Sequence, residues 1–230
     1  MTTTTELLDN PVLAGLHGAH ARFALSRGAA VRYDPRVAPF VALPAGAGPD
    51  DWANLAALIG PEGFGVIVGD ENAIPADWPV STRYEGVQLV GGATLGRLDP
   101  ELLTLGADDV PEMLALTEVT KPGPFFPRTH ELGHYVGLRD GAGELVAMAG
   151  ERQHPAGWTE ISAVCTAASQ RGRGLASRLI NHLAAEITAR GERPYLHAVS
   201  ENVGAIRLYE ALGFELRRPI DFTVITPPAG

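Results

Sequence analysis

The sequence has a single cysteine, Cys165, among its 230 residues. An intrachain disulfide is therefore excluded, and so is a zinc site built from several cysteines. Cationic residues are also few, because 18 lysines and arginines stand against 27 aspartates and glutamates, a formal net charge of -9. Proteins that bind nucleic acid or a membrane surface usually present a basic face. We therefore expect neither partner, and one cysteine is compatible with a cytoplasmic location.

Long apolar runs are missing as well. No segment has the roughly 20 apolar residues that a membrane-spanning helix needs. Residues 1–10 include Glu6 and Asp9 and lack a basic start and an apolar core, so they predict no secretory signal. The 45% of hydrophobic and 20% of charged residues are typical of a globular protein. The length fits one large domain or two small ones.

The first hundred residues are rich in alanine, glycine and proline and contain no catalytic motif. Apolar residues at helical spacing predict a helix over 51–59, and apolar runs predict strands over 64–68 and 87–90. The stretch 91–100 is a plausible boundary between regions. We therefore expect an N-terminal α/β region over residues 1–100 and a second domain over 103–226.

The second region has a sharper pattern. Asp-Gly at 140–141, between two apolar runs, predicts a hairpin. Apolar residues four apart predict an amphipathic helix over 174–190, closed by Gly191. The full prediction is a helix from 108, a loop over 121–127, strands over 135–138, 144–149 and 158–166, the helix over 174–190, a strand over 194–199, a helix over 202–212, and strands over 214–217 and 222–225.

A glycine-rich loop, residues 171–176, links a predicted strand to a helix. Two glycines allow a tight turn and a close approach of the backbone to a ligand. Free N–H groups at a helix start attract phosphate groups, and Arg171 and Arg173 add positive charge. The loop lacks the Gly-Lys-Ser/Thr of a P-loop and the three glycines of a dinucleotide fingerprint. The alternative is a plain turn without a ligand.

A second motif, over residues 202–214, combines Asn202, Tyr209 and the pair Gly213-Phe214. Together with the loop it resembles the acetyl-CoA core of the Gcn5-related N-acetyltransferase (GNAT) superfamily, in its FR47-like branch. The resemblance covers about residues 103–226. It departs at Ala167-Ala168, where relatives often carry His-Pro.

The resemblance implies an α/β fold whose mixed central sheet has splayed fourth and fifth strands and flanking helices. By analogy with two-part members, residues 1–100 are a degenerate copy of that fold. The implied function is transfer of an acetyl group from acetyl-CoA directly to an amine. The acceptor is open, no metal is expected, and a homodimer is an open alternative. The implied cofactor-binding residues are Val164, Thr166, Arg171, Gly172, Arg173, Gly174, Leu175, Ala176, Ser177, Asn202 and Ala205.

Tyr209 resembles the acid of the family, which protonates the departing thiolate; the alternative is a packing tyrosine. Glu160 is the predicted general base; the alternative is that it is a solvated glutamate on a strand. Glu151 is the second candidate for the base. Phe125 and Phe126 are predicted to line the acceptor site, with Met148 and Glu151 beside them. A packing role remains the alternative for the two phenylalanines. Cys165 is expected to be a small buried hydrophobe.

A rival motif, His130-Glu131-Leu132-Gly133-His134, matches the His-Glu-x-x-His signature of zinc proteases. That reading needs a long helix, whereas Pro127 precedes the segment and a strand-like run follows it. A second alternative is a sensor that binds acyl-CoA without turning it over.

Overall fold

The computed structural model describes residues 5–69, 73–92 and 95–228, which form two β-sheets and five α-helices. The strands are β1 (Ala24–Arg27), β2 (Ala30–Tyr33), β3 (Val41–Ala42), β4 (Gly65–Val68), β5 (Val80–Gly91), β6 (Leu103–Leu105), β7 (Tyr135–Arg139), β8 (Leu145–Glu151), β9 (Trp158–Thr166), β10 (Arg193–Val199) and β11 (Phe214–Ile225). The helices are α1 (Pro11–Leu16), α2 (Pro49–Ile59), α3 (Val110–Thr120), α4 (Leu175–Ala189) and α5 (Val203–Ala211). Short 3-10 helices are η1 (Thr5–Leu8), η2 (Ala21–Phe23), η3 (Ala107–Asp109), η4 (Thr129–Leu132) and η5 (Ala168–Gln170).

The larger sheet has the strand order β4-β11-β5-β10-β9-β8-β7-β6. Strands β9 and β10 run parallel, and the other neighbouring pairs run antiparallel. A mixed central sheet is therefore confirmed. The smaller sheet has the order β1-β2-β3 and belongs to the N-terminal half.

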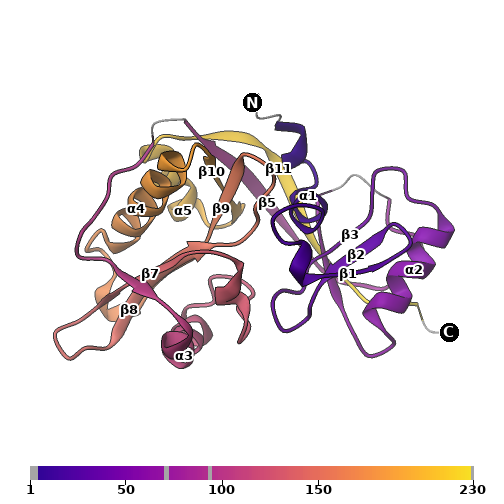
Figure 1. The fold of residues 1–230 in the computed structure, drawn as a ribbon, viewed down its shortest axis with the longest axis horizontal. Coiled ribbons are helices and arrows are strands. Elements are labelled where there is room, and N and C mark those ends of the chain that lie inside the picture. The colour runs from indigo at the N-terminus through magenta and orange to yellow at the C-terminus, as the bar shows by residue number, and fades with distance from the viewer. Residues whose placement is uncertain (1–4, 70–72, 93–94, 229–230) are drawn as a thin grey trace.

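Helices α4 and α3 cover opposite faces of β8 and β9 (Figure 1). Leu179, Leu183 and Ile187 form the fully buried face of α4, as their spacing predicts. They pack in one cluster with Ala147 of β8, whereas Met148, the next residue, packs in the cluster of α3. This alternation along β8 gives the sheet two buried faces. None of the helices in the described ranges is long and apolar enough to cross a bilayer.

Strands β9 and β10 separate soon after they meet. Their backbone pairing ends at Tyr195 and Glu160, although both strands continue. We call this last pair, Tyr195 and Glu160, the vertex. Beyond the vertex β9 contains a bulge, because Ala163 and Val164 together oppose Ala149 of β8. Ala163 has a φ of 53°, a left-handed value that is rare for a residue with a side chain. These two strands correspond to the fourth and fifth strands of the family's fold, and their predicted splay is confirmed.

The two halves of the chain share one pair of long strands. Strand β5 precedes the predicted boundary at 91–100, yet it lies between β10 and β11. Figure 1 shows β5 and β11 crossing the centre of the molecule, with β1–β3 and α2 on one side and α3–α5 on the other. The segments 214–217 and 222–225, predicted as two strands, form the single strand β11. The division into regions 1–100 and 103–226 stays a prediction.

Candidate functional site

The glycine-rich loop leads directly into α4 and leaves the helix start open. Gly172 and Gly174 have φ values of 76° and 74°, in the left-handed region that favours glycine. No atom lies within 4 Å of a Cβ built on either residue. No side chain caps α4, and its first turn contains no acidic residue. The first N–H groups of the helix are therefore available to an anion.

The two arginines of the loop lie on its exposed side. The Arg171 side chain reaches back to the carbonyl of Thr166 at 3.4 Å, and Arg173 contacts the side chain of Gln170. Neither arginine forms a salt bridge with a described carboxylate. Their charge is therefore available to a negatively charged ligand near the helix start.

Beyond the vertex, the gap between β9 and β10 exposes a stretch of unpaired backbone. Val164 and Thr166 lie on β9 in this stretch and are half-buried. Strand β10 pairs with β5 on its other edge as far as Val199. A slender ligand can therefore form a strand-like pair with β9 in the gap, and the glycine-rich loop lies at the end of β9.

Three predicted residues lie on helix α5 or at its N-cap: Asn202, Ala205 and Tyr209. The Asn202 side chain caps the helix by accepting a hydrogen bond from the amide of Ala205 at 3.1 Å. Tyr209 is 8% exposed and packs edge-on against Phe214. Burial raises the pKa of Tyr209 to about 12, so the phenol keeps its proton near neutral pH. None of the described residues hydrogen-bonds its hydroxyl.

Glu160 lies at the vertex itself, completely buried. Its carboxylate accepts hydrogen bonds from Arg152 Nη2 at 2.6 Å and Nε at 3.0 Å, and from His197 Nδ1 at 2.7 Å. Burial alone would raise the pKa of Glu160, but Arg152 and His197 outweigh it and lower the pKa to about 2. A carboxylate that holds its charge so firmly is a weak proton acceptor, which argues against a general base.

The residues predicted to line the acceptor site lie on both faces of the larger sheet. Phe125 and Met148 lie in one cluster under α3, where Phe125 meets Tyr135 edge-on at 5.7 Å. Phe126 lies nearby and its amide donates to Thr129. Glu151 takes part in a separate group, since it pairs with Arg190, the residue after α4, at 2.6 Å. The structure therefore brings Phe125 and Met148 together and leaves Glu151 apart from them.

Cys165 is buried in the same cluster as Met148. Burial raises the pKa of its thiol to about 11, so the reactive thiolate is scarce near neutral pH. This environment fits a packing role and not a nucleophile.

The zinc-protease motif does not form the helix that a zinc site would need. Residues Thr129–Leu132 form the short 3-10 helix η4, and His134 lies beyond it. His130 contacts the carbonyl of Pro127, whereas His134 pairs with Glu186 of α4 at 2.7 Å. No group of three histidine, cysteine or acidic residues within the described ranges is arranged to hold a metal.

Three polar residues at the vertex were not predicted as site residues: Arg152, His197 and Gln88. His197 lies two positions after Tyr195 on β10, and Glu160 lies opposite Tyr195, so strand alternation places both side chains on one face. A charged residue within the apolar run of β9 was the available signal. The contact with Gln88 of β5 depends on a strand pairing across 109 positions, which the sequence pattern does not reveal.

A surface pocket of about 410 Å³ adjoins the loop on the side of β7. Arg139, Arg173 and Arg178 contribute to its wall. Arg139 pairs with Asp109 and Arg178 pairs with Asp99, so two of these three charges are already neutralised.

Comparison with solved structures decides the family. A chain from Novosphingobium aromaticivorans, described as an acetyltransferase from the GNAT family, is 40% identical with a TM-score of 0.88, over 96% of this chain and 99% of that one. The chain belongs to the GNAT family. The family model of FR47-like proteins matches residues 135–222 of this GNAT chain.

More distant structures share the GNAT fold. A GCN5-related N-acetyltransferase from Kribbella flavida is 19% identical with a TM-score of 0.58, over 95% of this chain and 96% of that one. A Drosophila protein is 15% identical with a TM-score of 0.59, over 83% of this chain and 70% of that one. No curated protein matches. These two structures show the fold, and the 40% identical chain supports an acetyltransferase.

Proposed function

We propose that this GNAT protein is an acetyl-CoA-dependent N-acetyltransferase that transfers the acetyl group directly to an amine. The observation that carries the proposal is the arrangement around β9 and β10. An uncapped helix start with two unpaired arginines lies at the end of β9, and an unpaired stretch of β9 leads from it to the vertex. The first part fits a pyrophosphate and the second fits an extended pantetheine arm.

The residues proposed to hold acetyl-CoA fall into two groups. Val164 and Thr166 pair with the pantetheine arm through their backbone, and the amides of residues 171–177 receive the pyrophosphate. Asn202 and Ala205 approach from the start of α5. The fit is supported by the open space over Gly172 and Gly174.

In the proposed reaction the amine nitrogen bonds to the acetyl carbon, and the carbon–sulfur bond breaks. The Tyr209 hydroxyl donates its proton to the sulfur that leaves, and the proton of the amine passes to water. The free hydroxyl of Tyr209 and its raised pKa support the role of acid. The hydrogen bonds of Glu160 do not support the role of base, so we assign it another role below.

The deciding experiment is calorimetry of acetyl-CoA on the wild type and on Gly174→Glu, with zinc analysis of the same preparation. We expect micromolar binding by zinc-free wild type and its loss in the variant, because the new carboxylate lies where the phosphates bind. Absence of binding, with stoichiometric zinc, would reject the proposal in favour of the zinc site.

Tyr209→Phe tests the chemical step. With an amine that gives CoA release in a screen, we expect kcat to fall about 100-fold, the usual size of a lost proton donor. The Kd for acetyl-CoA should change less than threefold. Tight binding with no turnover of any amine would instead indicate the sensor.

A further inference from the structure

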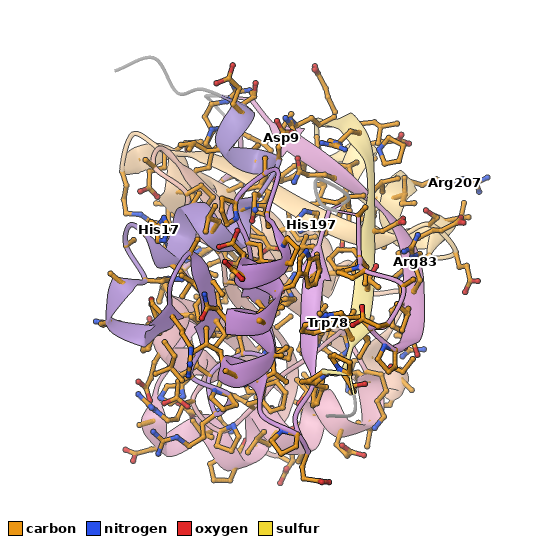
Figure 2. All side chains as sticks on the ribbon, turned by 90° about the vertical axis from the view of Figure 1, so that its right-hand side faces the viewer. Asp9, His17, Trp78, Arg83, His197 and Arg207 are labelled. Carbon is orange, nitrogen blue, oxygen red and sulfur yellow. The ribbon has the colours of Figure 1, made fainter. Side chains whose placement is uncertain are left out.

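The vertex of β9 and β10 is crossed by a line of hydrogen-bonded side chains, which we call the polar row. It joins one residue from each successive segment of the sheet and ends near the N-terminus. Its members are Arg152 after β8, Glu160 of β9, His197 of β10, Gln88 of β5, Arg217 of β11 and Asp9 before α1. Figure 2 shows His197 inside the molecule with Asp9 above it, whereas Arg207 of α5 projects outward.

The bonds of the row fix its orientation. The Gln88 carbonyl oxygen accepts from Arg217 Nη1 at 2.7 Å, and its amide nitrogen donates to the carbonyl of Leu8 at 2.9 Å. The same amide nitrogen lies 3.0 Å from His197 Nε2, which must therefore be the acceptor. In this arrangement the Nδ1–H of His197 donates to Glu160.

The polar row crosses from β9 to β10 next to the vertex. Backbone pairing between β9 and β10 ends at Glu160 and Tyr195, and His197 is the second residue beyond it on β10. The bond between Glu160 and His197 thus joins the two strands just where backbone bonds stop. Among the described residues, no other side-chain hydrogen bond links β9 directly to β10.

The row is not explained by stability alone. Glu160 and Gln88 are completely buried, and a buried ion pair often contributes no more than well-packed apolar residues would. What such a network does provide is a single geometry, because every donor and acceptor has a defined direction. Arg217 supports this reading, since it is the extra residue of a bulge in β11 between Leu216 and Arg218.

We propose that Glu160 and His197 form a clamp that sets the opening of β9 and β10, and so are positioning residues for acetyl-CoA. The clamp fixes where the strands part, and this decides whether the exposed edge of β9 can pair with the pantetheine arm. The proposal rests on the proposed function, because it assigns that arm to the gap. It differs from a general base, which would act on the amine and leave cofactor binding intact.

The test compares His197→Leu with the conservative His197→Asn by acetyl-CoA calorimetry and amide hydrogen exchange. We expect His197→Leu to raise the Kd about tenfold and to speed exchange of residues 196–199 at least tenfold, with α4 unchanged. His197→Asn keeps an N–H donor near Glu160, so its Kd should stay within threefold of the wild type. Glu160→Gln should weaken binding as His197→Leu does, with the same Kd from pH 6 to pH 9.

Thr159→Val is the matched control. Thr159 is buried on the same strand and donates to Glu192 at 2.5 Å, but at the paired end of β9 and β10. Its loss should lower stability and leave both the Kd and the exchange of residues 196–199 unchanged. Equal Kd values and equal exchange in wild type and His197→Leu would overturn the clamp, as would the same weakening in Thr159→Val. If wild type does not bind acetyl-CoA but exchange responds as expected, the proposed function fails together with the positioning role, and only the clamp between the two strands stands.

Discussion

The two halves of the molecule contain the same unit, a strand, a helix and a parallel strand, with different loops. In the C-terminal half the unit is β9-α4-β10, and in the N-terminal half it is β3-α2-β4, where Phe40 and Val66 form a parallel bridge. Each unit joins the central pair of strands, since β4 pairs with β11 and β10 pairs with β5. This symmetry supports the proposal that the N-terminal half is a degenerate copy of the GNAT fold.

Helices α2 and α4 differ in the charged groups at their N-termini. The first turn of α2 contains Asp50 and Asp51, and Asp51 accepts a hydrogen bond from the amide of Gly48 at 3.0 Å. The start of α4 has no such carboxylate and is preceded by Arg171 and Arg173. An anion would be repelled at the first helix and attracted at the second. The strand-helix-strand unit that both halves share is therefore not enough to form a phosphate site. The loop before the helix and the first helical turn decide whether an anion can bind.

The gaps between the parallel strands differ as well. The pocket beside β3, α2 and β4 holds only about 20 Å³, with Val41, Trp52 and Ile67 in its wall. The side chain of Val41 lies against Gly65, where an added Cβ would come within 2.6 Å of it. We therefore expect one acetyl-CoA per chain, held in the C-terminal half.

The largest expected difference concerns the ion pairs of the two halves. Glu160→Gln leaves Arg152 buried without a full partner and should lower the free energy of unfolding by about 3 kcal/mol at pH 7. Asp34→Asn, in the N-terminal half, breaks the partly exposed pairs with Arg36 and Arg128 and should cost less than about 1 kcal/mol. Denaturant unfolding of both variants measures the difference, and equal costs would contradict it.

The pH dependence has a definite sign. The folded pKa of Glu160 is lowered from 4.5 to about 2, so its charge stabilises the fold fully above pH 4.5. That contribution is lost as the pH falls from 4.5 towards 2. Glu160→Gln should flatten this part of the stability profile, and an unchanged slope would show that Glu160 does not contribute to it.

Two left-handed glycines, one before each helix, can be compared by the same substitution. Gly46 and Gly174 precede α2 and α4, have φ values of 76° and 74°, and have open space around an added Cβ. Glutamate at either position should cost about 1–2 kcal/mol of stability, because both conformations are left-handed. Only Gly174→Glu should weaken acetyl-CoA binding, by about 100-fold, equal to about 2.7 kcal/mol. Weakening by Gly46→Glu would mean that the N-terminal half contributes to the site.

The arginines of the loop should contribute less than its glycines. Replacing Arg171 and Arg173 with glutamine should weaken acetyl-CoA binding about tenfold in calorimetry, about 1.4 kcal/mol. The effect should shrink as salt is added, because the two side chains are exposed. Lys121→Gln is the control, since it removes an exposed charge at the C-terminal end of α3 and should leave binding unchanged. A loss that does not depend on salt would point to distortion of the loop instead.

Local signals predicted the elements that carry the proposed site. The four-residue spacing of α4 and its two glycines are properties of adjacent residues, and both are confirmed. The sequence predicted two strands, over 214–217 and 222–225, where the structure has the single strand β11, which includes Pro219. Pro219 lies where β11 pairs only with β5, so a residue without an N–H is tolerated there.

Features that depend on distant pairing were not predictable in the same way. The place of β5 between β10 and β11 follows from contacts across more than a hundred positions. The polar row depends on that placement, because Gln88 meets His197 only once β5 lies beside β10. Glu160 was predicted as the general base; its partners, and with them its proposed role as a clamp, needed the structure.

The smallest expected effect tests whether the start of α2 is purely structural. Asp51→Ala removes the hydrogen bond to the Gly48 amide and a negative charge from the first turn, which should cost about 1 kcal/mol. Acetyl-CoA binding should stay within twofold of the wild type, because the affected helix lies in the other half. A second, weak binding event in calorimetry of Asp51→Ala would show that only this carboxylate prevents acetyl-CoA from binding at the start of α2. Its absence would show that the closed gap beside Val41 excludes the ligand even when the helix start is free.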